Sequence, residues 1–205
     1  MPLDLAHLIQ PETTAVITSE CQRGVVGDLS NLPELGDAAR GGMLDRIAEI
    51  CDAARRVSAP VIHCTAERRV DGFGANRNGR LFQYMARAKH PLHTGSEAVE
   101  IVPEIDVLED DLVLPRLHGI SPFQGTELDF ILRNQGITTI IATGVSVNVA
   151  IQALTFDAIG AGYQVVIPRD AVAGFPEGYA DMVFQNSLGA IATLVSTADV
   201  LDAWG

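Results

Sequence analysis

The segment at residues 143–150 has the composition of an active-site turn, because glycine, serine and asparagine follow a strongly apolar run at residues 138–142. Its first part, GVSVN, nearly matches the G-x-S-x-G elbow that places a nucleophilic serine between a strand and a helix. That arrangement also needs a histidine later in the chain, and none follows His118. We therefore do not expect a serine hydrolase of this type, and Ser146 could simply cap the start of a helix.

Glu20 ends another apolar segment, where a carboxylate is either a catalytic acid or base or a solvated residue at the end of a strand. The residues after it, Cys-Gln-Arg-Gly, are polar or small, which fits the rim of a site. Cys21 could act as a nucleophile, but side chains alternate along an extended segment, so it should point away from Glu20. We expect Cys21 to be a buried spectator and Glu20 to be the candidate acid or base.

Motifs for cofactors and metals are missing. The glycines of the long polar loop at residues 66–79 do not form G-x-G-x-x-G, and no G-x-x-x-x-G-K-[ST] sequence occurs. Four histidines, at positions 63, 90, 93 and 118, lack the spacing of zinc ligands. We expect no cofactor and no metal, although a loop of this length is often functional.

Apolar, β-branched runs alternate with helical patterns along the chain. Strands are predicted at residues 13–19, 60–64, 111–114, 138–143, 163–168 and 192–196, and helices at 37–57, 81–89, 127–134, 147–160 and 178–189. This alternation predicts right-handed crossovers and a parallel sheet that is covered on both faces. We expect an α/β fold of three layers, with a doubly wound, mainly parallel six-stranded sheet whose ligands bind beyond the carboxyl ends of the strands.

The composition favours one compact domain, residues 1–205, because 205 residues with 47% hydrophobic content can bury a sizeable core. The formal net charge of −12 argues against nucleic acid and anionic membranes as partners. No apolar run reaches about 18 residues, and the N-terminus lacks the pattern of a signal peptide. Three cysteines without metal-type spacing are typical of reduced thiols, so a cytoplasmic location is expected.

Three segments together resemble the isochorismatase-like cysteine hydrolases, which include nicotinamidases, N-carbamoylsarcosine amidohydrolase and isochorismatase. They are SPFQGTELD at residues 121–129, GITTII at residues 136–141 and TGVSVNV at residues 143–149. The family pattern is similar, with S-x-F-x-G-T-x-L, then G-(V/I)-x-x-(L/I), then T-G-V-x-x-N-V-C. The resemblance covers most of the chain. It implies a Rossmann-like fold, a small-molecule substrate and a homodimer or homotetramer.

The chemistry of the family uses an aspartate, a lysine and a cysteine, and the resemblance places them at Glu20, Leu117 and Ala150. Glu20 keeps a carboxylate, but Leu117 carries no charge and Ala150 has no nucleophilic atom. Loss of such a nucleophile can lower turnover about 10⁶-fold, so we do not expect covalent amidase chemistry. The resemblance also implies a cis peptide bond at Val145–Ser146, which would aim the N–H groups of Ser146 and Ala150 at an oxyanion.

Isochorismatase itself cleaves a vinyl ether without the cysteine, because a carboxylate protonates the substrate and water completes the reaction. By this resemblance Glu20 is expected to act as general acid/base on a small, anionic metabolite, since burial without a neighbouring lysine favours the protonated carboxyl. Substrate contacts are expected among Gln22, Arg69, Arg77, Arg116, His118, Ser146 and Ala150. The alternatives are that the arginines are ordinary surface charges and that His118 orients Glu20 or faces solvent. The alternative is a catalytically silent binding or scaffold protein that keeps the fold and the pocket.

Overall fold

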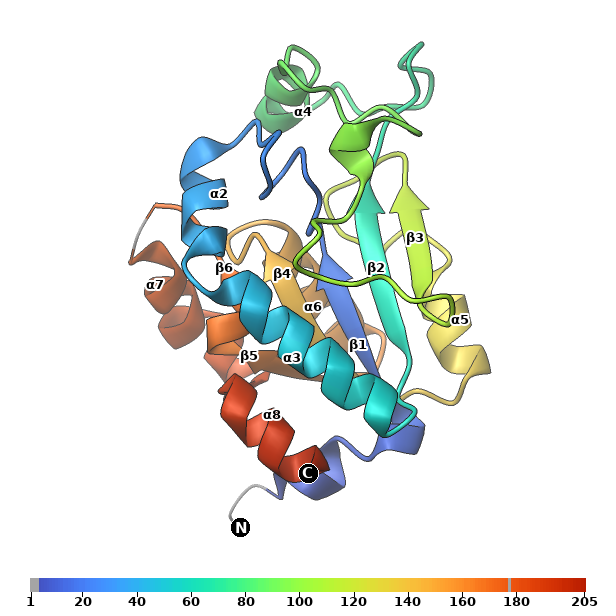
Figure 1. Cartoon of the computed structure of the whole chain (residues 1–205), viewed down its shortest axis with the longest axis vertical. Coiled ribbons are helices and arrows are strands. Elements are labelled where there is room, and N and C mark those ends of the chain that lie inside the picture. Colours follow the sequence, from blue (N-terminus) through green and yellow to red (C-terminus); the bar gives the residue numbers. More distant parts are fainter. Residues whose placement is uncertain (1–3, 177) are drawn as a thin grey trace.

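The computed structural model describes residues 4–176 and 178–205 as an α/β fold with a parallel sheet between two layers of helices (Figure 1). The strand order is β3-β2-β1-β4-β5-β7, and the two-residue strand β6 pairs with the end of β4. The strands are β1 (Thr14–Ser19), β2 (Val61–Ala66), β3 (Leu112–Arg116), β4 (Thr139–Val145), β5 (Gln164–Pro168), β6 (Val172–Ala173) and β7 (Thr193–Val195). This architecture confirms the predicted six-stranded sheet and adds β6 to it.

Helices cover both faces of the sheet, as predicted. The helices are α1 (Leu5–Leu8), α2 (Pro33–Arg40), α3 (Met43–Arg56), α4 (Arg80–Met85), α5 (Leu128–Asn134), α6 (Ala150–Gly160), α7 (Tyr179–Asn186) and α8 (Thr197–Trp204). In β1, Val16 belongs to the apolar core that includes α3 and α8, whereas the next residue, Ile17, belongs to the core on the other face that includes α5, α6 and α7. Because side chains alternate across the sheet, a strand covered on both faces must be apolar at successive positions.

The topology creates a crevice at one edge of the sheet. The chain runs from β1 outward to β2 and β3, then returns to β4 beside β1 and continues in the opposite direction through β5 and β7. In open parallel sheets, ligands bind outside the carboxyl ends of the strands where the order reverses. Glu20 directly follows β1 and Ser146 directly follows β4, so both lie at this reversal.

Several elements differ from the expectation. Helix α1 was not predicted, and α4 ends at Met85, four residues before the predicted end. The helix expected over residues 37–57 is two helices, because the chain turns at residues 41–42, where Gly42 has a φ of 110° that favours glycine. The helix expected from residue 147 begins at Ala150. Helix α8 lies outside the predicted helices, and a capping box fixes its start, in which Ser196 and Asp199 bond to each other's backbone N–H groups.

A buried polar network joins the start of β3 to β1, β2 and α3. His63 Nδ1 lies 2.8 Å from Thr18 Oγ1, and His63 Nε2 lies 3.3 Å from Asp111 Oδ2. The Asp111 carboxylate also accepts hydrogen bonds from Arg55 and from the backbone N–H of Leu108. The side chains of His63 and Asp111 are only 1% and 3% exposed, so these hydrogen bonds replace those lost to water.

Stability is expected to fall on mild acidification because of His63. Burial lowers the pKa of His63 below its ordinary value, although contact with Asp111 opposes this effect. Below about pH 6.5 the unfolded chain therefore binds a proton at this histidine more readily than the folded chain does. The free energy of unfolding should decrease between pH 7.5 and 5.5, by at most about 1.4 kcal/mol per pH unit for one proton. Urea titrations monitored by circular dichroism measure this slope.

His63→Asn removes the titrating group, so the pH slope should become shallower in this variant. His7→Asn is the control, because His7 is exposed on α1. An unchanged pH slope in the His63→Asn variant would contradict the prediction that His63 causes the loss of stability on acidification.

Candidate active site

A cavity of about 290 Å³ lies at the carboxyl ends of the central strands. Its lining includes Glu20 after β1, Arg68 after β2, residues 117–120 after β3 and Ser146 after β4. Figure 1 shows α2 and α4 beyond this edge of the sheet. Their side chains, with those beside them, give the cavity an apolar wall made of Leu32, Leu35, Leu81, Phe82, Met85 and Leu92. The site therefore combines polar groups at the strand ends with a hydrocarbon surface, as is typical of small-molecule pockets.

Glu20 forms an ion pair with Arg116, the last residue of β3. Arg116 Nη2 contacts Glu20 Oε1 and also lies 3.4 Å from the carbonyl oxygen of Ile120. The arginine is only 6% exposed, so the pair lies largely out of water. Glu20 has a left-handed backbone with a φ of 55°, which costs a non-glycine residue roughly 1–2 kcal/mol and is a common form of strain at functional sites.

This ion pair corrects one expectation drawn from the sequence. Leu117 indeed supplies no charge, but Arg116, one residue earlier, places its guanidinium beside the Glu20 carboxylate. The carboxyl is therefore not isolated from positive charge. Arg116 was expected to bind a substrate carboxylate, whereas the structure pairs it with the candidate acid or base.

The turn between β4 and α6 forms the other polar side of the cavity. The peptide bond between Val145 and Ser146 is cis, as predicted. Ser146 and Ala150 both line the cavity, and Ala150 is the first residue of α6. Because the first N–H groups of a helix have no intrahelical acceptor, the Ala150 N–H is available to a ligand oxygen. The side chain of Ala150 is only a methyl group, so the first residue of α6 provides no nucleophile.

The cysteines do not supply a nucleophile from elsewhere. Cys21, Cys51 and Cys64 are all free and buried. Burial raises the pKa of Cys51 and of Cys64 to about 12, and it also raises the pKa of Cys21. The Cys21 thiol lies 3.7 Å from the carbonyl oxygen of Ser19 and does not line the cavity. The expectation that Cys21 is buried is confirmed.

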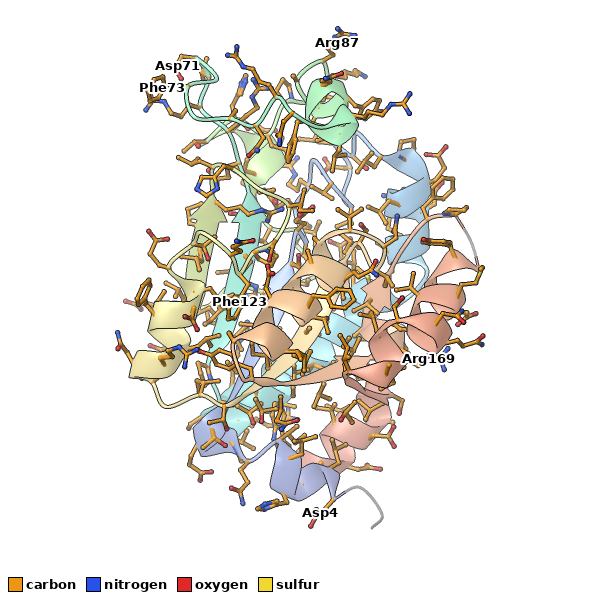
Figure 2. All side chains as sticks on the ribbon, turned by 180° about the vertical axis from the view of Figure 1, so that it is seen from behind. Asp4, Asp71, Phe73, Arg87, Phe123 and Arg169 are labelled. Carbon is orange, nitrogen blue, oxygen red and sulfur yellow. The ribbon has the colours of Figure 1, made fainter. Side chains whose placement is uncertain are left out.

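The structure brings some of the expected substrate contacts together and leaves others apart. Glu20, Arg116, Leu117, His118, Ser146 and Ala150 all line the cavity. Gln22 does not, because its amide is buried and bonds to the backbone of Ala66 and Val99. Arg69 pairs with Asp71 in the loop after β2, which projects from the molecule where Figure 2 labels Asp71. Arg77 is exposed and also lies outside the lining.

Several lining residues were not expected from the sequence, namely Glu67, Arg68, Asn76 and Asn148. Asn76 Oδ1 accepts a hydrogen bond of 2.7 Å from the Gly119 N–H, which ties the loop after β2 to the loop after β3. The length and polarity of residues 66–79 predicted a functional loop. The sequence did not indicate which of its side chains face the cavity. Among the described residues, no cluster of three or more His, Cys, Asp or Glu side chains could hold a metal ion.

No helix within residues 4–176 and 178–205 has the length and hydropathy needed to cross a membrane.

The family model called Isochorismatase domain matches residues 14–199 of the chain. An isochorismatase family protein from Burkholderia thailandensis superposes with a TM-score of 0.78 at 26% identity, over 94% of this chain and 96% of its own. N-carbamoylsarcosine amidase from an Arthrobacter species is 24% identical over 164 residues, which is 78% of this chain and 62% of the amidase. Isochorismatase family protein YwoC from Bacillus subtilis is 35% identical over 78 residues, 38% of this chain and 41% of YwoC.

The match to the family model covers most of the chain, and the fold is shared over nearly its whole length. The chain therefore belongs to the isochorismatase family, as the three sequence segments indicated. The aligned region spans less than two thirds of YwoC and of the amidase, so their activities are not transferred by the match alone.

Proposed function

We propose that this protein is an isochorismatase-family hydrolase that cleaves a small, anionic metabolite by direct addition of water, without a covalent intermediate. The observation that carries this proposal is the Glu20–Arg116 ion pair, which lines the same cavity as the methyl group of Ala150. A carboxylate is present for proton transfer, and the start of α6 provides no nucleophile. We expect a homodimer or homotetramer, as the family resemblance implies.

In this mechanism Glu20 acts as general acid/base. Its carboxylate takes a proton from a water molecule, and the water oxygen bonds to the electrophilic carbon of the substrate. The electron pair moves to the substrate oxygen, which accepts hydrogen bonds from the backbone N–H groups of Ser146 and Ala150. When the electron pair returns, the bond to the leaving group breaks and Glu20 gives that group the proton. Arg116 holds the carboxylate in place throughout.

The competing function is ligand binding without turnover, and Ala150 is the observation that favours it. Removing a covalent nucleophile can cost about 10⁶-fold in enzymes that depend on one. Direct attack by water avoids this loss only if the Glu20 carboxylate and the N–H groups of Ser146 and Ala150 are sufficient for catalysis. Direct measurement of turnover therefore separates the two functions.

Activity should be insensitive to iodoacetamide, because all three thiols are buried and their pKa values are raised. The assay uses a panel of small amides, esters and vinyl ethers that carry a carboxylate, in water enriched in ¹⁸O. We expect turnover of at least one compound, with ¹⁸O in the product and equal rates before and after treatment. Unfolding in urea should expose the thiols to the reagent, which provides the positive control.

Loss of activity after treatment of the folded protein would contradict the non-covalent route. Thermal stabilisation by panel compounds without turnover of any of them would establish the binding function instead.

A further inference from the structure

Arg68 differs from the other arginines in the described part of the chain. Most of these arginines form an ion pair with a carboxylate. Those without an ion pair in the structure, other than Arg68, are exposed to solvent: Arg56, Arg77, Arg80 and Arg87. Arg68 is half-buried, lines the cavity and has a buried Nε atom without a hydrogen-bond partner. Arg116 also has buried guanidinium nitrogens without partners, Nε and Nη1, but its Nη2 is paired with Glu20. A guanidinium that is partly removed from water without a counter-ion is unfavourable, so the place of Arg68 in the cavity indicates a ligand that brings the anion.

The position of Arg68 is built into the fold. Its backbone N–H donates to the carbonyl oxygen of Leu92 at 2.8 Å, and its carbonyl oxygen accepts from the Thr94 N–H at 3.0 Å. A Cβ atom at Gly72 would lie 3.2 Å from Arg68 Nη2, so the glycine leaves space for the guanidinium. Gly72 also has a φ of 66°, which glycine adopts without strain. The backbone of Arg68 is therefore held beside the cavity, with space for its guanidinium next to Gly72.

The other charges around the cavity limit the ligand to one anionic group. Glu20 is paired with Arg116. Glu67 forms no ion pair with Arg68, and its Oε1 atom accepts a hydrogen bond from Thr65 Oγ1 at 3.1 Å. Glu34 lies in the first turn of α2 and is exposed. A second anionic group on the ligand would meet one of these two glutamates without a free cation.

The apolar wall describes the rest of the ligand. Leu92, whose carbonyl oxygen bonds to Arg68, lines the cavity together with Leu81, Phe82 and Met85 around α4. A hydrocarbon chain or ring placed against these side chains would be removed from water. A planar carboxylate matches the fork of a guanidinium with two parallel hydrogen bonds.

We propose that Arg68 is the carboxylate receptor of this site and that its ligand is a monocarboxylate with an apolar body. The use of this ligand as a substrate rests on the proposed hydrolase function, but its recognition by Arg68 does not. Arg116 then serves Glu20, and the two arginines have separate roles in one cavity.

Titration calorimetry of the full chain tests this proposal with butanoate, hexanoate, hexanamide and adipate as probes. Hexanoate should bind at least about tenfold more tightly than hexanamide, because the amide lacks the charge. Affinity should rise about fourfold for each methylene between butanoate and hexanoate. Adipate should bind more weakly than hexanoate, because its second carboxylate meets Glu34 or Glu67.

Arg68→Gln should lower hexanoate affinity about ten- to hundredfold and leave hexanamide affinity within about threefold. Arg77→Gln is the matched control, since Arg77 comes from the same loop, is exposed and lies outside the lining. Arg68→Lys should keep the preference for the acid over the amide. Equal affinities for hexanoate and hexanamide in the unaltered protein would overturn the proposal, as would equal losses in the Arg68→Gln and Arg77→Gln variants.

The two proposals fail in different ways. Hexanoate binding that depends on Arg68, with no turnover of any panel compound, would overturn the hydrolase function and leave the receptor in place. Turnover of panel compounds by a protein that does not distinguish hexanoate from hexanamide would overturn the receptor and leave the hydrolase function in place.

Discussion

Glu20→Gln is expected to lower kcat/KM of the proposed hydrolysis by about 10²–10⁴-fold, the usual contribution of a general acid or base. Glutamine keeps the length of the side chain and one acceptor oxygen but cannot exchange a proton near neutral pH. The panel compound with the highest turnover provides the assay. Activity retained within about threefold would exclude Glu20 as the proton-transfer group.

The loss of the ion pair must be separated from the loss of the proton-transfer group. Glu20→Gln leaves Arg116 buried without its counter-ion, which can destabilise a protein by about 3–5 kcal/mol. Urea unfolding of the variant measures this cost, and the assay is run where circular dichroism shows the variant to be folded. Glu100→Gln is the matched control because Glu100 also pairs with an arginine, Arg23, but lies outside the cavity lining. It should leave kcat/KM unchanged.

The hexanoate titration adds a second readout for the Glu20→Gln variant. Because Arg68 contacts neither Glu20 nor Arg116 through a hydrogen bond or an ion pair in the described structure, hexanoate affinity should persist when turnover is lost. Equal losses of turnover and hexanoate binding would indicate a collapsed cavity. That result would contradict the proposal that Glu20 transfers protons and Arg68 binds the carboxylate independently of each other.

Gly144→Ala is expected to destabilise the fold by more than about 4 kcal/mol, or to prevent folding. Gly144 pairs in register with Ser19, next to Glu20. A Cβ atom at Gly144 would collide with the Ser19 carbonyl oxygen and lie 2.8 Å from the Ser19 nitrogen, and these backbone atoms cannot rotate away. Gly144 also has a φ of 99°, which an alanine adopts only with strain.

Two glycines provide controls for this variant. Gly162 has a φ of 95° but no atom within 4 Å of the added Cβ, so Gly162→Ala measures strain without a collision. Gly160 ends α6 with open space around the added Cβ and without a positive φ, so Gly160→Ala should be neutral or slightly stabilising. Urea unfolding should rank the variants in the order Gly144→Ala, Gly162→Ala and Gly160→Ala, from most to least destabilised. A Gly144→Ala protein as stable as Gly162→Ala would contradict the predicted collision.

The main elements were predictable because their signals are local. The runs TAVITS and TIIATGV are apolar at successive positions, which is the pattern of strands buried on both faces, and they form β1 and β4. The motif segments identified the family, and the cis bond at Val145–Ser146 followed from that resemblance. Helix α8 was missed, although Ser196 and Asp199 have the spacing of a helix start, because only the capping hydrogen bonds distinguish it from a turn.

The residues by themselves determined the fold class and the family, and they predicted Glu20 as the candidate carboxylate and Ala150 as the position of the family cysteine. Only the tertiary structure decided that Arg116 pairs with Glu20, because the parallel arrangement of β1, β2 and β3 brings together side chains 96 positions apart. It also distinguished Arg68 from Arg69, since neighbouring side chains on a loop turn in different directions. One lines the cavity and the other pairs with Asp71 outside it. Local patterns reflect burial, whereas the partner of a charge depends on which distant segments the packed sheet places beside it.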